Sequence, residues 1–229
     1  MTSDYYKEYE KRNPVKFKRR FGIDLLKDPI FLSFINTRNQ FILNERKKLG
    51  KRVKICDVGA GTGLASIELK KSLPKDDFVV EVDYSLHLLS KFKSKGRVCA
   101  DGLQLPFRNN TFDIVFCMDF LHHVNDIERG VKEMLRVSKD YVVIIEPNKL
   151  NPIYLLYGLV NKEERGILHV GYKKIMKILG DNKYSVHFIE PFPFHLYLMR
   201  TPYAWLSRMF AALKLTRLFA TYVLIVKKL

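Results

Sequence analysis

Five short apolar runs, separated by amphipathic stretches, constrain the fold of this chain more than any other feature. Between the runs, apolar residues follow helical spacing over 64–73, 85–95 and 126–138. Strand and helix repeated in this order predict a parallel sheet with helices on both faces. The predicted strands are 53–58, 78–83, 97–100, 112–118 and 141–146.

The stretch KICDVGAGTGLASIE, residues 54–68, places three glycines at alternate positions directly after the first predicted strand. Such a turn lets backbone N–H groups and a helix N-terminus meet a ligand with no Cβ atoms in the way. A P-loop is excluded, because Leu64 and Ala65 follow Gly63 where Lys and Ser or Thr are required. Nicotinamide dinucleotide binding is weakened but stays open, since the last residue of its fingerprint would be Leu64 or Ser66.

The ligand edge of the predicted sheet is marked by residues at or just past the strand ends. Ligands of parallel sheets bind outside the carboxyl ends of the strands. We therefore expect five residues to lie near the ligand: Gly59, Asp83, Asp101, Asp119 and Glu146.

Four motifs over residues 53–148 resemble, in order and spacing, the class I S-adenosylmethionine-dependent methyltransferases that act on small molecules. DVGAGTG is similar to the loop that wraps the methionine part of the cofactor in that family. VVEVDYS supplies an acid for the ribose hydroxyls, and CADGLQLPF is similar to the segment that meets the adenine. FDIVFCMDFLHHV resembles the fourth strand with its L-H-H tail. The resemblance implies S-adenosylmethionine as the cofactor.

The resemblance also implies which residues hold the cofactor. Asp83 would accept hydrogen bonds from both ribose hydroxyls, a task that suits a carboxylate. Glu81, on the same side of the strand, has the weaker claim and needs a partner if it is buried. The implied cofactor-binding residues are Asp57, Gly59, Ala60, Gly61, Gly63, Asp83, Tyr84, Asp101, Gly102, Leu103 and Met118.

Catalysis needs little acid–base chemistry here, because the cofactor carries its own leaving group and the enzyme mainly positions the acceptor. His122 and His123 are nevertheless candidate bases, since a neutral imidazole titrates near neutral pH. In the family such a pair often packs the loop instead. Asp119 has a similar position and a weaker claim, while His169 and His195 are expected to be structural.

Two segments depart from the family pattern or imitate another one. The usual L-K-P-G-G before the fifth strand is replaced by VSKDY, which puts the geometry of that turn in doubt. NPIY, residues 151–154, resembles the N-P-P-Y motif of amino-methyltransferases, but it follows the fifth predicted strand instead of the fourth. We reject that interpretation and expect Asn151 and Pro152 to begin a helix.

The resemblance implies an α/β, Rossmann-like, doubly wound fold with a mostly parallel seven-stranded sheet and an antiparallel last strand. N-terminal helices and a helical insertion near the C-terminus complete it. The predicted divisions are a helical cap over 1–50, a cofactor-binding core over 51–148 and a C-terminal part over 149–229. The C-terminal part completes the sheet with strands at 185–190 and 219–228. Its insertion over 191–218 is expected to cover the substrate.

The formal net charge of +16 is concentrated at the two ends of the chain. Residues 1–54 hold 15 Lys and Arg against 6 Asp and Glu, and residues 191–229 hold 6 against none. Such an excess attracts nucleic acid, lipid headgroups or a phosphorylated substrate, although solvated basic faces explain it equally well.

Cys56, Cys99 and Cys117 lie in predicted strands without CxxC spacing, so we expect buried residues in a reducing compartment, the cytoplasm. We predict neither a disulfide framework nor a metal site. The charged N-terminus and the lack of a run of roughly 18 apolar residues predict no secretory signal and no membrane span.

The aromatic insertion and the L-H-H segment favour a small, apolar or lipid-like acceptor such as a quinone, with peripheral contact to an anionic membrane as a further possibility. Two other functions stay open. One is an RNA methyltransferase whose basic ends bind phosphates. The other is a non-catalytic subunit that binds the cofactor and supports a partner.

Overall fold

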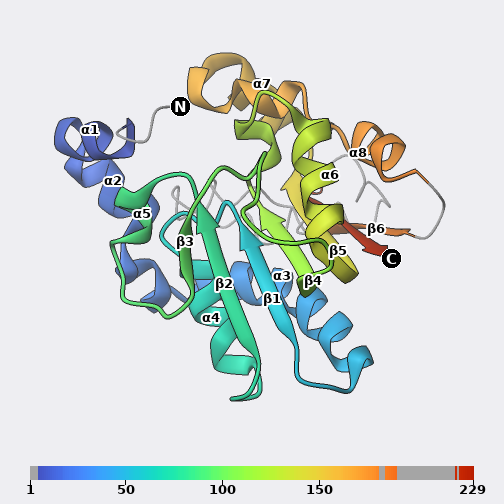
Figure 1. Cartoon of the computed structure of the whole chain (residues 1–229). Coiled ribbons are helices and arrows are strands. Elements are labelled where there is room, and N and C mark those ends of the chain that lie inside the picture. The colour runs from blue at the N-terminus through green and yellow to red at the C-terminus, as the bar shows by residue number, and fades with distance from the viewer. Residues whose placement is uncertain (1–4, 181–183, 190–219, 221) are drawn as a thin grey trace.

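A computed structural model describes residues 5–180, 184–189, 220 and 222–229. Within these ranges the strands form one seven-stranded sheet of order β3-β2-β1-β4-β5-β7-β6, seen in Figure 1. The first five strands are parallel, and β7 runs antiparallel to both of its neighbours. The fold class expected from the sequence is confirmed. The strands are β1 Lys54–Val58, β2 Phe78–Asp83, β3 Arg97–Cys99, β4 Phe112–Met118, β5 Ser138–Pro147, β6 Tyr184–Ile189 and β7 Tyr222–Lys228.

Helices pack on both faces of the sheet and above its ligand edge. The α-helices are α1 Tyr5–Arg12, α2 Pro14–Phe21, α3 Pro29–Leu49, α4 Leu64–Ser72, α5 Leu86–Leu89, α6 Ile127–Val137, α7 Pro152–Val160 and α8 Tyr172–Leu179, and the 3₁₀ segments are η1 Ile23–Lys27, η2 Leu121–His123 and η3 Lys162–Leu168. Figure 1 shows α1, α2 and α7 beyond the edge to which β1, β2 and β4 point. The N-terminal helices therefore lie where a ligand of the sheet is expected.

The core has two halves because successive strand residues face opposite sides of the sheet. In β4, Ile114 and Phe116 pack with residues of α3 and α4, whereas Val115 and Cys117 pack with residues of α6 and α8. All four are fully buried. Burying a large apolar side chain contributes about 1.5–3 kcal/mol, so the central strands supply much of the stability.

The helix predicted over 85–95 is wrong beyond its first turn, since α5 ends at Leu89. Ser85 caps its N-terminus by accepting a hydrogen bond from the Leu88 N–H. The guanidinium of Arg97 donates to the carbonyl oxygens of Leu89 and Phe92. These carbonyl groups are satisfied by a side chain from β3, so the chain turns instead of continuing the helix.

The expected burial of the cysteines holds for Cys56 and Cys117 but is wrong for Cys99, which is exposed. Its strand, β3, has only three residues and lies at the edge of the sheet. An edge strand has a neighbour on one side alone, and Cys99 is the last residue of that strand.

The segment VSKDY forms no separate turn, because β5 begins at Ser138 directly after α6 ends at Val137. The Ser138 hydroxyl donates a hydrogen bond to the carbonyl oxygen of Tyr141 at 2.7 Å. A register shift between Phe112 and Ile114 of the paired strand β4 accommodates the early start. The missing proline and glycines are thus compensated by a longer, irregular strand.

The expected helix after Asn151 is confirmed as α7. The predicted insertion over 191–218, with its aromatic residues and His195, lies outside the described residues. Among the helices that are described, none combines the length and the apolar character needed to cross a bilayer.

Candidate active site

Three glycines after β1 have left-handed backbone conformations, with φ of 77° at Gly59, 57° at Gly61 and 82° at Gly63. A side chain would be strained by this backbone conformation at all three positions, and at two of them it would also meet a neighbouring side chain. A Cβ at Gly59 would come within 2.6 Å of the Phe120 ring, and one at Gly63 would come within 3.1 Å of a Glu81 carboxylate oxygen. At Gly61 nothing lies within 4 Å of that position. The backbone of Gly61 therefore faces open space that a ligand can enter.

Asp83 ends β2 beside this loop, as the sequence predicted. Its Oδ2 accepts a hydrogen bond from the Gly61 N–H at 2.7 Å, and its Oδ1 accepts one from the Ser85 N–H at 2.8 Å. Burial raises the pKa of Asp83, and these two backbone hydrogen bonds oppose that shift. A carboxylate has about four lone-pair sites, so two acceptor positions stay available for hydroxyl donors.

Asp57 is buried in β1, where its carboxylate accepts a hydrogen bond from the Ser66 hydroxyl at 2.7 Å. Burial raises the pKa of Asp57 to about 7, and the charges of Glu81 and Asp83 contribute to this rise against the effect of Ser66. Asp57, Glu81 and Asp83 thus place three carboxyl groups near the glycine loop.

Glu81 is fully buried and has the partners that its burial requires. Lys70 donates to its Oε1 at 2.7 Å, and Arg97 donates to its Oε2 at 2.7 Å. Both carboxylate oxygens of Glu81 are engaged in ion pairs, and its carboxylate lies directly beside Gly63 of the glycine loop. This arrangement favours Asp83 over Glu81 as the ribose-binding acid.

The remaining predicted cofactor residues surround the same edge. Asp101 is exposed and its Oδ1 accepts a hydrogen bond from the Leu103 N–H at 2.8 Å. Gly102 packs so closely against Phe120 that a Cβ would lie 2.5 Å from the ring. Tyr84 is exposed, Met118 is half-buried at the end of β4, and the Ala60 N–H donates to the Val82 carbonyl oxygen.

These features fit S-adenosylmethionine. The glycine loop offers backbone without side chains, Asp83 offers acceptors for two hydroxyl groups, and the carboxylates near the loop complement the positive charges of the cofactor's sulfonium and ammonium groups. Asp101 is exposed and lies just past β3, where the adenine of the cofactor can reach its carboxylate. Each requirement is met by a different strand end, and the parallel sheet brings these ends to one edge.

The segment after β4 is held by the buried carboxylate of Glu146. Its Oε1 accepts hydrogen bonds from the N–H groups of Phe120 at 2.9 Å and Leu121 at 2.6 Å. Its Oε2 lies 2.7 Å from Nδ1 of His122. The sequence placed Glu146 at the ligand edge without a role, and the structure makes it the support of this segment.

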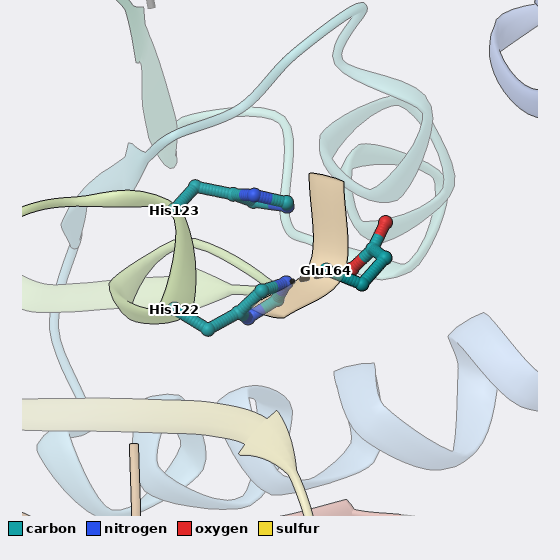
Figure 2. Close-up of side chains that lie close together, drawn as sticks. All are labelled: His122, His123 and Glu164. Atoms are coloured by element: carbon teal, nitrogen blue, oxygen red, sulfur yellow. Dashed lines mark ion pairs between the residues drawn. The ribbon is translucent and has the colours of Figure 1, made fainter. Parts of the chain in front are cut away.

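His122 lies between two carboxylates, since its Nε2 is 3.3 Å from Glu164 Oε2 (Figure 2). Burial alone lowers the pKa of His122, but the charges and hydrogen bonds of Glu146 and Glu164 raise it to about 10. The ring is thus a buried imidazolium with both nitrogens engaged. A proton held this firmly makes His122 a poor general base.

The His123 ring packs against His122 with 4.0 Å between centroids. Burial and the neighbouring His122 charge lower the pKa of His123 to about 3, so this ring stays neutral. It lines a small cavity under the N-terminal helices. The lining residues are Tyr5, Tyr6, Tyr9, Arg20, Phe21, His123 and Glu163.

Arg20 closes the cavity with a network of charges that the sequence analysis missed. Its Nη2 lies 2.5 Å from Glu164 Oε1, and its Nη1 lies 3.6 Å from Glu163 Oε2. The Tyr5 hydroxyl donates to Glu163 Oε1 at 2.6 Å. The only sequence signal was the basic N-terminal segment, in which Arg20 does not differ from its neighbours.

Asp119 has an unfavourable backbone conformation, with φ of 53° at a residue other than glycine. Its carboxylate lies 3.3 Å from Nη1 of Arg38, a residue of α3 that is almost completely buried. The guanidinium carbon of Arg38 lies 3.5 Å from the Phe34 ring centroid and 3.6 Å from that of Tyr222. This contact fixes Asp119 at the ligand edge and was also missed, because Arg38 sits in a helix far away in the sequence.

Comparison with known proteins agrees with this geometry. A family model described as a methyltransferase domain matches residues 56–145. A demethylmenaquinone methyltransferase of Corynebacterium glutamicum is 35% identical over 121 residues, which cover 52% of this chain and 51% of that relative. The chain thus spans about half the length of this curated relative.

Two solved structures share the fold at low sequence identity. A SAM-dependent methyltransferase from Archaeoglobus fulgidus is 18% identical with a TM-score of 0.58, over 83% of this chain and 94% of that one. The plantazolicin methyltransferase BpumL, solved with a triazolic desmethylPZN analog and SAH, is 15% identical with a TM-score of 0.61, over 99% of this chain and 93% of that one.

The fold is that of the class I S-adenosylmethionine-dependent methyltransferases, as the motifs predicted. Residues 56–145 are similar to a methyltransferase domain, and the fold and the strand-end residues described above are those expected for binding S-adenosylmethionine.

We predict that the Asp57 carboxyl makes stability fall as pH rises. The pKa of Asp57 is raised in the folded state to about 7, so folding favours its protonated form. The contribution of Asp57 to the free energy of unfolding is fully present below its unfolded-state pKa of about 3.9. It is lost between pH 4 and pH 7, at about 1.4 kcal/mol for each pH unit crossed. Urea unfolding of the wild type and Asp57→Asn across this range measures the difference.

The free energy of unfolding of the wild type minus that of Asp57→Asn should decrease as pH rises from about 4 to about 7. Asp113→Asn is the control, because Lys51 lowers the pKa of Asp113 and its contribution has the opposite sign. Equal pH profiles for the wild type and Asp57→Asn would contradict the prediction.

Proposed function

We propose that this chain transfers the methyl group of S-adenosylmethionine to a small, apolar or lipid-like acceptor, of which a quinone is the example. The observation that carries the proposal is the group of aromatic side chains from α1 and α2, namely Tyr5, Tyr6, Tyr9 and Phe21, which surround a water-sized cavity next to His123. Tyr6 connects these aromatic side chains with the cofactor edge. Burial raises the pKa of Tyr6 to about 12; the charge of Arg20 lowers this pKa, and the charges of Asp83 and Glu164 raise it further. Its hydroxyl is therefore within electrostatic reach of the proposed ribose acid.

In this proposal the cofactor residues are those implied by the sequence. The backbone of Gly59, Ala60, Gly61 and Gly63 binds the methionine part, with Asp57 as the nearby negative charge. Asp83 and Tyr84 bind the ribose, Asp101, Gly102 and Leu103 bind the adenine, and Met118 packs at the end of β4. When bound, the cofactor supplies an activated methyl group together with its leaving group.

The protein's own contribution is to hold the acceptor in line and to exclude water. Three tyrosines and Phe21 offer an apolar, aromatic surface that suits a planar ring. His123 lines this cavity and His122 does not, so His123 is the better placed of the two predicted histidines to contact the acceptor. The neutral ring of His123 can accept a hydrogen bond from a hydroxyl group of the molecule that receives the methyl group.

The Corynebacterium relative, a demethylmenaquinone methyltransferase, gives independent support for a quinone-like acceptor. That similarity covers about half of each chain, so the acceptor is inferred chiefly from the aromatic side chains of the N-terminal helices. An RNA acceptor and a partner-supporting role are the alternatives that the experiments below distinguish.

We also propose peripheral contact with an anionic membrane from the cytoplasmic side. Helix α7 exposes four apolar side chains, Leu155, Leu156, Leu159 and Val160. The positive net charge complements anionic headgroups. A lipid-like acceptor would then reach the cavity without crossing water.

The cofactor assignment predicts that Asp83→Asn weakens binding of S-adenosylhomocysteine by at least about tenfold, because an amide accepts fewer hydroxyl hydrogen bonds than a carboxylate. Isothermal titration calorimetry of the full chain measures the affinity. Asp76→Asn, in an exposed position away from the glycine loop, is the control. Unchanged affinity in Asp83→Asn would contradict the assignment, and absent binding by the folded wild type would favour a different ligand.

The acceptor assignment predicts that Phe21→Ala raises KM for a reduced demethylated quinone about tenfold while the affinity for S-adenosylhomocysteine stays unchanged. The reason is the lost aromatic contact in the cavity. Phe41→Ala, a half-buried phenylalanine of α3 that packs near His187, is the matched control. Methyl transfer to total RNA but to no quinone would overturn this proposal, and turnover only after addition of a partner would favour the subunit role.

The membrane proposal predicts co-sedimentation with vesicles containing phosphatidylserine and weaker binding to neutral phosphatidylcholine vesicles. Replacing Leu156 and Val160 by Glu should reduce binding to the anionic vesicles, because both the apolar contact and the attraction are lost. Equal binding by the wild type and the double variant would count against α7 as the contact.

A further inference from the structure

We propose that His122, His123 and Glu164 form a binding site for one divalent transition-metal ion, such as Zn²⁺, Co²⁺ or Mn²⁺. Figure 2 shows the two imidazole rings and the carboxylate converging from η2 and η3. One potential ligand atom from each residue lies within 4.8 Å of the other two. Two histidines and a carboxylate are a common donor set for such ions.

The distances are close to those of an occupied site. Ligand atoms bound to one ion at about 2.0–2.2 Å lie roughly 3–4 Å apart. His122 Nε2 and Glu164 Oε2 are already 3.3 Å apart. Side-chain adjustments of about 1 Å therefore bring the third ligand, His123, into place.

The residues behind these ligands hold them as metal ligands are commonly held. Metal-bound imidazoles usually donate their second N–H to a carboxylate, which fixes the ring and increases its basicity. Glu146 Oε2 takes this role at 2.7 Å from His122 Nδ1 and leaves Nε2 toward Glu164. Arg20 binds Oε1 of Glu164 and leaves Oε2 toward His122.

His123 supplies the second observation that points to a ligand. Among the described residues, its Nδ1 is a buried ring nitrogen with no hydrogen-bond partner. An unpaired buried polar atom costs about 1–3 kcal/mol, so such atoms need an explanation. A metal ion would supply the missing partner.

The charges of the cluster also suit a divalent cation. Three carboxylates, those of Glu146, Glu163 and Glu164, face one guanidinium, that of Arg20. Carboxylates therefore outnumber guanidinium groups in the cluster, which favours a cation. Binding is an exchange in which the ion takes the place of the proton between His122 Nε2 and Glu164, and that proton is released to solvent.

The sequence analysis predicted no metal site from the spacing of the cysteines, and it considered the two histidines only as candidate bases or packing residues. Glu164 reaches them only through the packing of η3 against η2. The proposed site does not depend on methyl transfer, and it is tested by binding alone.

The experiment is a calorimetric titration of the untagged full chain with ZnCl₂, together with visible absorption spectra on addition of CoCl₂. We expect one ion per chain and a cobalt spectrum typical of imidazole ligands. His123→Phe keeps an aromatic ring, Glu164→Gln keeps the side-chain shape, and each should weaken binding at least about tenfold.

His169→Phe is the matched control, since His169 is exposed and lies outside the cluster. This variant should bind the ion like the wild type. Circular dichroism of each variant confirms folding before titration. Absent binding by the wild type, or binding unchanged in both His123→Phe and Glu164→Gln, would overturn the proposal and leave the cluster as an ion-pair network. Neither outcome bears on binding of S-adenosylhomocysteine, so failure here is separable from failure of the proposed function.

Discussion

The buried carboxylate of Glu146 at the end of β5 is the interaction on which the ligand edge depends. A charge removed from water is tolerated only where hydrogen bonds replace the lost hydration. Two backbone N–H groups and the His122 ring provide them. These hydrogen bonds hold the segment after β4 in one position. From there Phe120 packs against Gly59 and Gly102, so the same carboxylate indirectly shapes the cofactor loop.

The N-terminal helices are joined to this carboxylate by a continuous series of polar contacts. Each link is an ion pair or a charged hydrogen bond, and several members are buried. Removing one member of such a series leaves a neighbour without compensation, which costs more than the pair contributes. The cap is therefore coupled to the sheet by electrostatics as well as by packing. The series runs from Glu146 through His122, Glu164, Arg20 and Glu163 to Tyr5.

Local sequence was sufficient where one βαβ unit contains all the determinants. The glycine turn after β1 and Asp83 at the end of β2 lie where the sequence predicted, because both positions follow from where a strand ends. Their roles in cofactor binding rest on the family resemblance and stay a prediction. The partners of His122 were not predicted, since Glu146 lies 24 residues away and Glu164 further still, with no local pattern that connects them. The shortened α5 had the same cause: a side chain from β3, Arg97, decides where that helix ends.

The position of β7 between β5 and β6 has a consequence for the order in which the molecule assembles. Strand β6 precedes β7 along the chain, yet within the described sheet β7 is its hydrogen-bonding neighbour. A ribosome therefore releases β6 before the strand that anchors it exists. The parallel half can form early, while β5 keeps an open edge that invites pairing with other chains. Connectivity thus makes the addition of residues 222–228 the step that joins β6 to the parallel part of the described sheet and covers the edge of β5.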